Sequence, residues 1–109
     1  MANKFGGFGG NNMQGLMKQA QMMQQKLAEA QQELEDTLVT GTAAGEMVTV
    51  TMNGKKSVSE VKIKKEAVDP DDVEMLEDLI LAAISDAEKK ADELSEEIMK
   101  PFGGLGGMM

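Results

Sequence analysis

The chain has 109 residues, enough for one small domain, and a formal net charge of −8 at pH 7. It contains no cysteine and no histidine, so disulfides, the common zinc sites and the usual general base near neutral pH are excluded, and we expect neither an enzyme nor a metal or cofactor site. No apolar run approaches the roughly 18 residues that span a bilayer, and the first residues lack a signal-peptide pattern, so we expect a cytoplasmic protein without a membrane partner.

Glycine-rich segments occupy both ends of the sequence. Residues 1–12 (MANKFGGFGGNN) and 101–109 (PFGGLGGMM) contain isolated apolar residues between glycines. Such a composition buries too little apolar surface to offset the entropy that is lost on ordering. We therefore expect a flexible tail at each end and a single folded, dimerising domain over residues 13–100.

Residues 13–36 have apolar positions that recur every three or four residues, which predicts a helix with one apolar stripe. Lys18 and Lys26 lie in its first half, where residues 13–28 contain no acid. Exposed lysines and glutamines in this half could contact DNA phosphates. They could equally form the polar outer surface of a coiled coil. The stripe consists of Met13, Leu16, Ala20, Met23, Leu27, Ala30 and Leu34.

After this helix the apolar period changes to two, which predicts strands. Residues 37–43 (TLVTGTA) form the first expected strand, and residues 47–52 (MVTVTM) form the second after a turn at 44–46. A third strand follows, with its apolar face continued by Val61 and Ile63. The short spacing between the strands predicts an antiparallel sheet.

Asn53-Gly54 is the strongest hairpin signal in the sequence, because a type I′ turn needs positive φ at both central residues. A two-residue loop at this point would pair Met52 with Lys55. Val58 would then lie on the polar face of the third strand, unless a β-bulge shifts it.

The last expected element begins in the sequence DPDDVE, where Asp69 can cap a helix and Pro70 fits its first position. Apolar residues then recur at helical spacing as far as Lys100, and Pro101 ends the helix. Residues 79–84 (LILAAI) are apolar on every side, so we expect them to be buried from several directions.

The lengths of these elements predict the architecture. Strands of about six residues extend about 20 Å, whereas helices over 13–36 and 71–100 extend about 36 and about 45 Å. We predict an α+β fold in which a helix, a three-stranded antiparallel sheet and a second helix follow one another along the chain. Since the sheet cannot cover either helix, we expect this fold to assemble as a homodimer. We expect the dimer interface on the second helix, at Leu76, Leu79, Ile80, Ala83 and Ile84.

Three segments of the sequence together resemble the YbaB/EbfC family of bacterial nucleoid-associated proteins. They are LMKQAQMMQQKL, VTGTAAGEMVTVTMNG and DPDDVEMLEDLILAAISDA, in that order and spacing, and the resemblance covers residues 13–99. It implies a tweezer-like homodimer, associated with the nucleoid, that binds double-stranded DNA with weak sequence preference and organises the nucleoid or modulates expression. The chain departs from the family pattern at Ser59-Glu60, where family members often have a basic pair, and at Glu88, Lys89 and Lys90, where they have arginines.

Positive charge is concentrated in one segment of this acidic chain. Residues 47–65 hold five lysines and one glutamate, a net charge of +4, whereas residues 69–100 hold twelve acids and three lysines, a net charge of −9. Lysines make point contacts to phosphates without reading bases, so we predict DNA binding of weak specificity. The predicted DNA-binding residues are Lys18, Lys26, Lys55, Lys56, Lys62 and Lys64.

Two other interpretations of the lysine cluster remain open. The lysines can belong to a solvated strand face that protects a sheet edge from aggregation, or they can meet the acidic second helix. Both are compatible with an alternative function, in which the protein is an acidic dimeric scaffold that binds an unknown protein partner and has negligible affinity for DNA.

Overall fold

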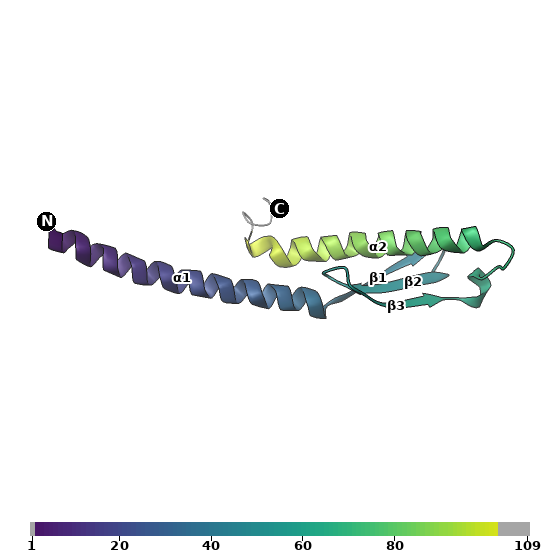
Figure 1. Ribbon diagram of the computed structural model, residues 1–109, viewed down its shortest axis with the longest axis horizontal. Coiled ribbons are helices and arrows are strands. Elements are labelled where there is room, and N and C mark those ends of the chain that lie inside the picture. Colours follow the sequence, from purple (N-terminus) through teal and green to yellow (C-terminus); the bar gives the residue numbers. More distant parts are fainter. Residues whose placement is uncertain (1, 103–109) are drawn as a thin grey trace. The chain divides into compact units, whose positions relative to one another are not determined.

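The structure is a computed structural model that describes residues 2–102, and side chains from residue 13 onward. Its elements follow the predicted order of helix, three strands and helix, which confirms the α+β class (Figure 1). The two long helices are α1 (Ala2–Asp36) and α2 (Val73–Met99). The remaining elements are strands β1 (Leu38–Ala43), β2 (Val48–Asn53) and β3 (Val58–Ile63), and the short 3-10 helices η1 (Lys65–Ala67) and η2 (Lys100–Phe102).

The chain divides into two compact units, residues 1–31 and 32–109. In the first unit, α1 begins upstream of Met13, so the backbone of residues 2–12 is helical where the composition predicted a flexible tail. Once a helical turn exists downstream, each added residue gains a hydrogen bond without a new nucleation cost, which counteracts the low helix propensity of glycine. Residues 103–109 of the other expected tail lie outside the described residues.

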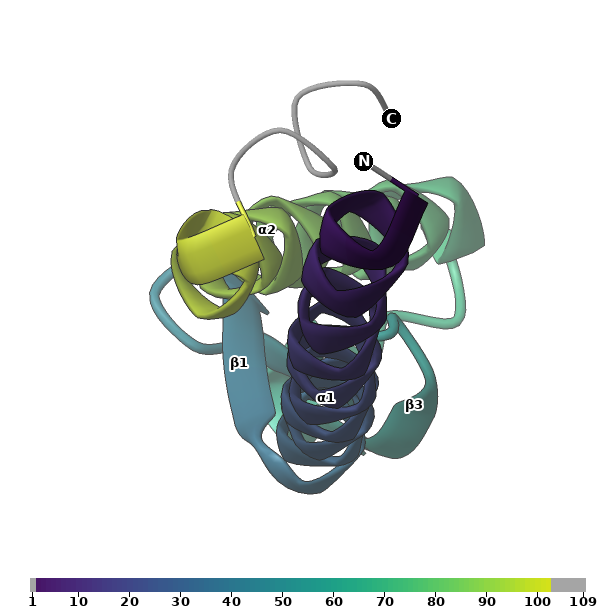
Figure 2. The same ribbon diagram turned by 90° about the vertical axis from the view of Figure 1, so that its left-hand side faces the viewer.

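The sheet has the strand order β1-β2-β3, and both neighbouring pairs are antiparallel. β2 is therefore central, and Figure 2 shows β1 and β3 at the opposite edges of the sheet. Directly opposite residues share a face, so the pairings of Val50 with Gly41 and with Val61 place these three residues on one face. The pairing of Thr49 with Lys62 places those two residues on the other face.

The register of β2 with β3 differs from the prediction. Met52 pairs with Val58 and not with Lys55, and the register shifts between Thr51 and Met52. This irregularity is the β-bulge that the sequence analysis allowed as an alternative. It places Val58 on the apolar face that carries Val61.

The predicted type I′ turn is also wrong, because the loop between β2 and β3 is longer. The Lys56 N–H donates to Asn53 O, and the Asn53 N–H donates to Ser57 O, both at 3.0 Å. Positive φ falls on Lys56 (67°) and not on Gly54, as in a three-residue loop whose type I turn is followed by a left-handed residue. Gly54 is needed for a different reason: its N–H donates to Leu34 O at 2.8 Å, and a Cβ there would lie 2.7 Å from Leu34 Cδ2.

The hydrophobic core lies on one face of the sheet only. α2 packs across β1 and β2 on this face, while all six residues of β3 are exposed. The alanines of α2 carry small side chains, so its backbone can approach the strands closely. The buried core residues are Ala43, Val48, Val50, Met52, Ala83, Ala87 and Ala91.

Helix α2 begins one turn later than predicted. Its N-cap is Asp72, whose carboxylate accepts a hydrogen bond from the Met75 N–H at 3.2 Å. Asp69, the predicted cap, instead accepts from the Asp71 N–H through its side chain and from the Asp72 N–H through its carbonyl, both at 2.9 Å. Aspartates compete for such local turns, so a run of three can place the cap at any of them.

Two apolar residues differ from expectation in their exposure. Leu81, in the segment predicted to be buried from several directions, is 63% exposed in the single chain. Phe102, assigned by composition to a flexible tail, lies in η2 and is only 8% exposed. The folded part of the chain therefore extends to Phe102 and leaves apolar surface at Leu81.

Candidate nucleic-acid interface

The face of the sheet opposite α2 carries Lys62 and Lys64. Lys62 lies directly opposite Thr49, and the Lys64 N–H donates to Met47 O at 2.9 Å beyond the end of β3. Since side chains alternate along a strand, both lysines lie on the same face of the sheet. Within residues 13–102, Lys64 makes no ion pair, and the contact of Lys62 with Glu60 Oε1 is long, at 3.9 Å. Their charges are therefore available to an external anion.

A hollow lies beside these two lysines. Two lysines and a threonine among its lining residues are of types that bind phosphate oxygens without selecting a base, while Glu46 adds one negative charge to the lining. Lys65 follows directly in η1 and is exposed; the predicted set omitted it, although it belongs to the same run of lysines. The residues that line the hollow are Glu46, Thr49, Lys62, Ile63 and Lys64.

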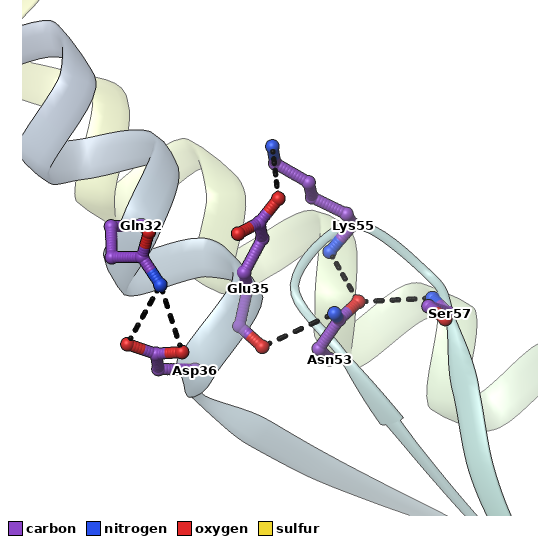
Figure 3. A network of polar contacts seen from close by, with 6 residues as sticks. All are labelled: Gln32, Glu35, Asp36, Asn53, Lys55 and Ser57. Carbon is purple, nitrogen blue, oxygen red and sulfur yellow. Dashed lines mark hydrogen bonds and ion pairs between the residues drawn. The ribbon is translucent and has the colours of Figure 1, made fainter.

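Lys55 belongs to a polar network at the tip of the β2–β3 hairpin (Figure 3). Its Nζ lies 3.1 Å from Glu35 Oε1. Asn53 organises the loop, because its Oδ1 accepts from the N–H groups of Lys55 and Ser57, both at 2.9 Å, and its amide donates to Glu35 O at 3.2 Å. This network joins the hairpin to the last turn of α1 and occupies the charge of Lys55.

Lys56, the other lysine of this loop, meets the acidic helix. Its Nζ lies 2.8 Å from Asp92 Oδ1 on α2. The hydrogen bond to Asp92 is the main cause that raises the pKa of Lys56 above its usual value, and the charges of Asp92 and Glu88 add to it. For Lys56, the structure therefore favours the interpretation in which the lysine pairs with the second helix.

Lys18 and Lys26 lie in the first unit, on α1. Both are exposed, and neither makes an ion pair within the part of the chain whose side chains are described. The same helix exposes an apolar stripe, with Met13 and Leu16 each 63% exposed. The two lysines thus stand on an exposed helix that also offers apolar surface.

The residues predicted for the dimer interface lie close to the core of the single chain. Ala83 is fully buried in that core and so has no surface left for a second copy. Its burial follows from the close packing of α2 on β1, which the sequence pattern does not reveal. The other four are partly buried and pack against the core: Leu76, Leu79, Ile80 and Ile84.

The described residues offer neither a metal site nor a membrane-spanning helix. No group of three or more acidic side chains there is arranged to hold a metal ion. Neither α1 nor α2, over the residues described, has a stretch that is both long and apolar enough to cross a bilayer.

Comparisons with known proteins agree with the fold. Residues 9–108 match the model of the YbaB/EbfC DNA-binding family. A nucleoid-associated protein of Agathobacter rectalis is 55% identical over 106 residues, covering 94% of each chain. One of Ruminiclostridium cellulolyticum is 53% identical over 104 residues, covering 94% of this chain and 90% of its own.

A solved structure of similar fold is that of an uncharacterized protein, HP0035, from Helicobacter pylori. It superposes with a TM-score of 0.69 at 21% identity, and the match covers 80% of this chain and 91% of that one. This likeness shows the fold, whereas the family match over residues 9–108 and the two relatives show that the chain belongs to the YbaB/EbfC DNA-binding family.

Proposed function

We propose that this protein is a nucleoid-associated homodimer that binds double-stranded DNA with little sequence preference. The main contacts are Lys62 and Lys64 on the open face of the sheet, joined by Lys18 and Lys26 of α1. The observation that carries the proposal is the electrostatic state of Lys62 and Lys64: within the described residues Lys64 makes no ion pair, and Lys62 makes only a long contact with Glu60 Oε1, at 3.9 Å. The family to which the chain belongs and the names of its relatives support DNA as the ligand.

The chemistry of the lysines accounts for weak specificity. An ammonium group neutralises a phosphate and releases a condensed counterion, but it lacks the planar fork with which arginine reads guanine. The chain contains no tryptophan or tyrosine and only three phenylalanines, so stacking on bases contributes little. Affinity then depends on phosphate contacts and therefore on salt.

Lys55 and Lys56 are weaker candidates for DNA contact than the sequence suggested. Each already pairs with an acid, Glu35 and Asp92 respectively, and a phosphate would have to replace that partner. The two loop lysines thus offer a matched comparison, because they lie in the same hairpin as Lys62 and Lys64 but are already neutralised.

Assembly as a homodimer is supported by the apolar surface that one chain leaves exposed. Val58, Val61 and Ile63 of β3 are 49%, 47% and 40% exposed, and Leu81 of α2 is 63% exposed. Burial of such surface against a second copy is favourable by about 25 cal/mol for each Å². Two copies also double the number of lysines that one DNA duplex can meet.

The test is fluorescence anisotropy with a labelled duplex across a salt series. For a dimer that contacts DNA through Lys62 and Lys64, the double variant Lys62→Gln/Lys64→Gln should reduce the slope of log affinity against log salt by about 3 to 4, since each lost phosphate contact removes about 0.9. The control Lys55→Gln/Lys56→Gln makes the same change in net charge and should reduce the slope much less.

Equal effects of the two double variants would contradict the proposed contacts. Binding that is very weak and independent of salt in the unmodified protein would contradict DNA binding itself. That second result would favour the alternative, an acidic dimeric scaffold that binds a protein partner.

A further inference from the structure

Two consecutive lysines lie at the tip of the β2–β3 hairpin (residues 53–57), and each meets an acid on a different helix. Lys55 Nζ lies 3.1 Å from Glu35 Oε1 in the last turn of α1, a pair that Figure 3 shows. Lys56 Nζ lies 2.8 Å from Asp92 Oδ1 on α2. The hairpin tip therefore carries two positive charges that carboxylates of the same chain already neutralise.

The hairpin does not depend on the carboxylate of Glu35 to stay in place beside α1. The Gly54 N–H donates to Leu34 O at 2.8 Å, and the Asn53 side-chain amide donates to Glu35 O at 3.2 Å. Both contacts use backbone carbonyls of α1. Neutralising the Glu35 side chain should therefore leave the hairpin tip where it is and free the charge of Lys55.

Lys56 stands at a position whose backbone favours glycine. Its φ is 67°, in the left-handed region, and the corresponding residue of such a three-residue loop is usually glycine. The ion pair with Asp92 offers little in return, because the two side chains are 44% and 60% exposed and remain solvated. A residue kept in an unfavourable conformation without a gain in stability is typical of a functional position.

Both pairs are weak enough to be exchanged for a stronger anion. The side chains of Lys55 and Glu35 are also exposed, at 39% and 49%, and salt screens such exposed pairs. A DNA duplex presents one negative charge for about every 1.7 Å of its axis, a stronger field than one carboxylate provides. Each exchange, however, breaks an existing pair and leaves a carboxylate beside the polyanion, so it adds less affinity than contact with an unpaired lysine.

We propose that the hairpin tip is a masked phosphate-binding site, and that Glu35 and Asp92 lower the affinity of the protein for DNA by occupying Lys55 and Lys56. This inference rests on the proposed DNA binding and adds a second contact region to it. The six residues of β3 span about 20 Å between the hairpin tip and Lys64. A duplex of about ten base pairs, about 34 Å long, is therefore long enough to reach both regions.

The test is the DNA-binding salt series with the full-length variant Glu35→Gln/Asp92→Asn, which removes both negative charges and nearly keeps the shape of the side chains. In a homodimer the freed Lys55 and Lys56 supply up to four phosphate contacts. The slope of log affinity against log salt should therefore steepen by about 3 to 4, and the affinity at about 0.1 M salt should rise at least about tenfold.

The matched control is Glu33→Gln/Glu93→Gln. These two acids lie on the same two helices, and both are exposed. Across residues 13–102 neither of them forms an ion pair. The control makes the same change in net charge and should change the slope much less, with circular dichroism as a check that both variants fold. Equal slopes for the two variants would overturn the masked site.

Removal of the lysines provides a second test. When Lys55→Gln/Lys56→Gln is added to Glu35→Gln/Asp92→Asn, the slope should return to that of Lys55→Gln/Lys56→Gln alone. A steepened slope that survives the loss of both lysines would show that the two acids act on DNA binding by another route, and would overturn the proposal.

The masked site and the proposed function can fail separately. Unmodified protein that binds DNA through Lys62 and Lys64, with equal slopes for Glu35→Gln/Asp92→Asn and its control, contradicts the masked site alone. Binding that appears only in Glu35→Gln/Asp92→Asn supports the masked site and contradicts Lys62 and Lys64 as the main contacts. Absence of binding in every variant at low salt overturns both proposals.

Discussion

At Gly41 the backbone of β1 comes closest to α2. A Cβ built at this glycine would lie 2.2 Å from Ala87 N and 2.3 Å from Ala83 O. Both neighbours are backbone atoms of a helix, so no side-chain rotation can relieve the contact. The glycine therefore fixes the distance between strand and helix, and with it the packing of the alanine-rich face of α2.

Replacement of Gly41 by alanine should force α2 away from the sheet. We expect Gly41→Ala to lower the free energy of unfolding by about 1–3 kcal/mol, the usual cost of overpacking a core, as measured by urea denaturation. The control is Gly15→Ala, because Gly15 lies in α1 with nothing within 4 Å of its added Cβ. That change should stabilise the helix by about 0.5–1 kcal/mol, and equal destabilisation by both variants would contradict the close approach.

The residue scale also shows where sequence reasoning reaches its limit. Asn53-Gly54 correctly predicted a reversal of the chain, because the turn propensity of these residues is local. The turn type was wrong, since Gly54 serves a contact with Leu34, which lies far away in the sequence. Turn propensity alone cannot distinguish a glycine that adopts positive φ from a glycine that is placed where a neighbouring residue leaves no space for a Cβ atom.

At the scale of elements, Asp86 joins α2 to the edge of β1. The hydrogen bond from the Thr42 N–H is the main cause that holds the pKa of Asp86 below its usual value, and the ammonium of Lys90 adds to this effect against the opposing influence of desolvation. A lowered pKa in the folded state means that the unfolded chain binds the proton more readily. Asp86 therefore stabilises the fold above the ordinary carboxyl pKa, and this stabilisation is lost as the pH falls through the folded-state value.

Asp86→Asn should separate this effect from the shape of the side chain. We expect the variant to melt a few degrees below the unmodified protein at pH 7, and the difference to shrink at a pH below the lowered folded-state pKa of Asp86, where the carboxylate is itself neutralised. The measurement is thermal unfolding by circular dichroism at both pH values. The control is Glu93→Gln, which changes an exposed acid on the same helix and should leave the melting temperature nearly unchanged. A difference for Asp86→Asn that does not depend on pH would contradict a stabilising role for the negative charge of Asp86.

Elements were more predictable than the contacts between them. The apolar periods of 3.6 and 2 follow from the geometry of one helix or one strand, so the sequence revealed all five long elements and their order. The lysine-bearing strand could be recognised in the same way. The pairing of Lys55 and Lys56 with Glu35 and Asp92 could not, because these partners lie on other elements.

At the scale of the whole molecule, charge and core are divided unequally between the two units. Residues 1–31 hold three lysines and one glutamate, a net charge of +2. Since the whole chain has a net charge of −8, residues 32–109 carry a net charge of −10. Every residue of the core cluster lies in the second unit, between Val39 and Ala91. The second unit thus holds the means to fold, and the first contributes positive charge and exposed apolar surface.

A chain that begins at Gln32 should therefore fold without residues 1–31. We expect a cooperative thermal transition with reduced helical ellipticity, and a salt slope for DNA binding lowered by about 3 to 4 if Lys18 and Lys26 of both copies contact phosphates. The full-length variant Lys18→Gln/Lys26→Gln is the matched control and should lose the same slope while it keeps the whole of α1. An unfolded fragment would show that the core needs α1. A folded fragment with an unchanged slope would confine DNA contact to residues 32–109, because of the four proposed contacts only Lys62 and Lys64 would then remain.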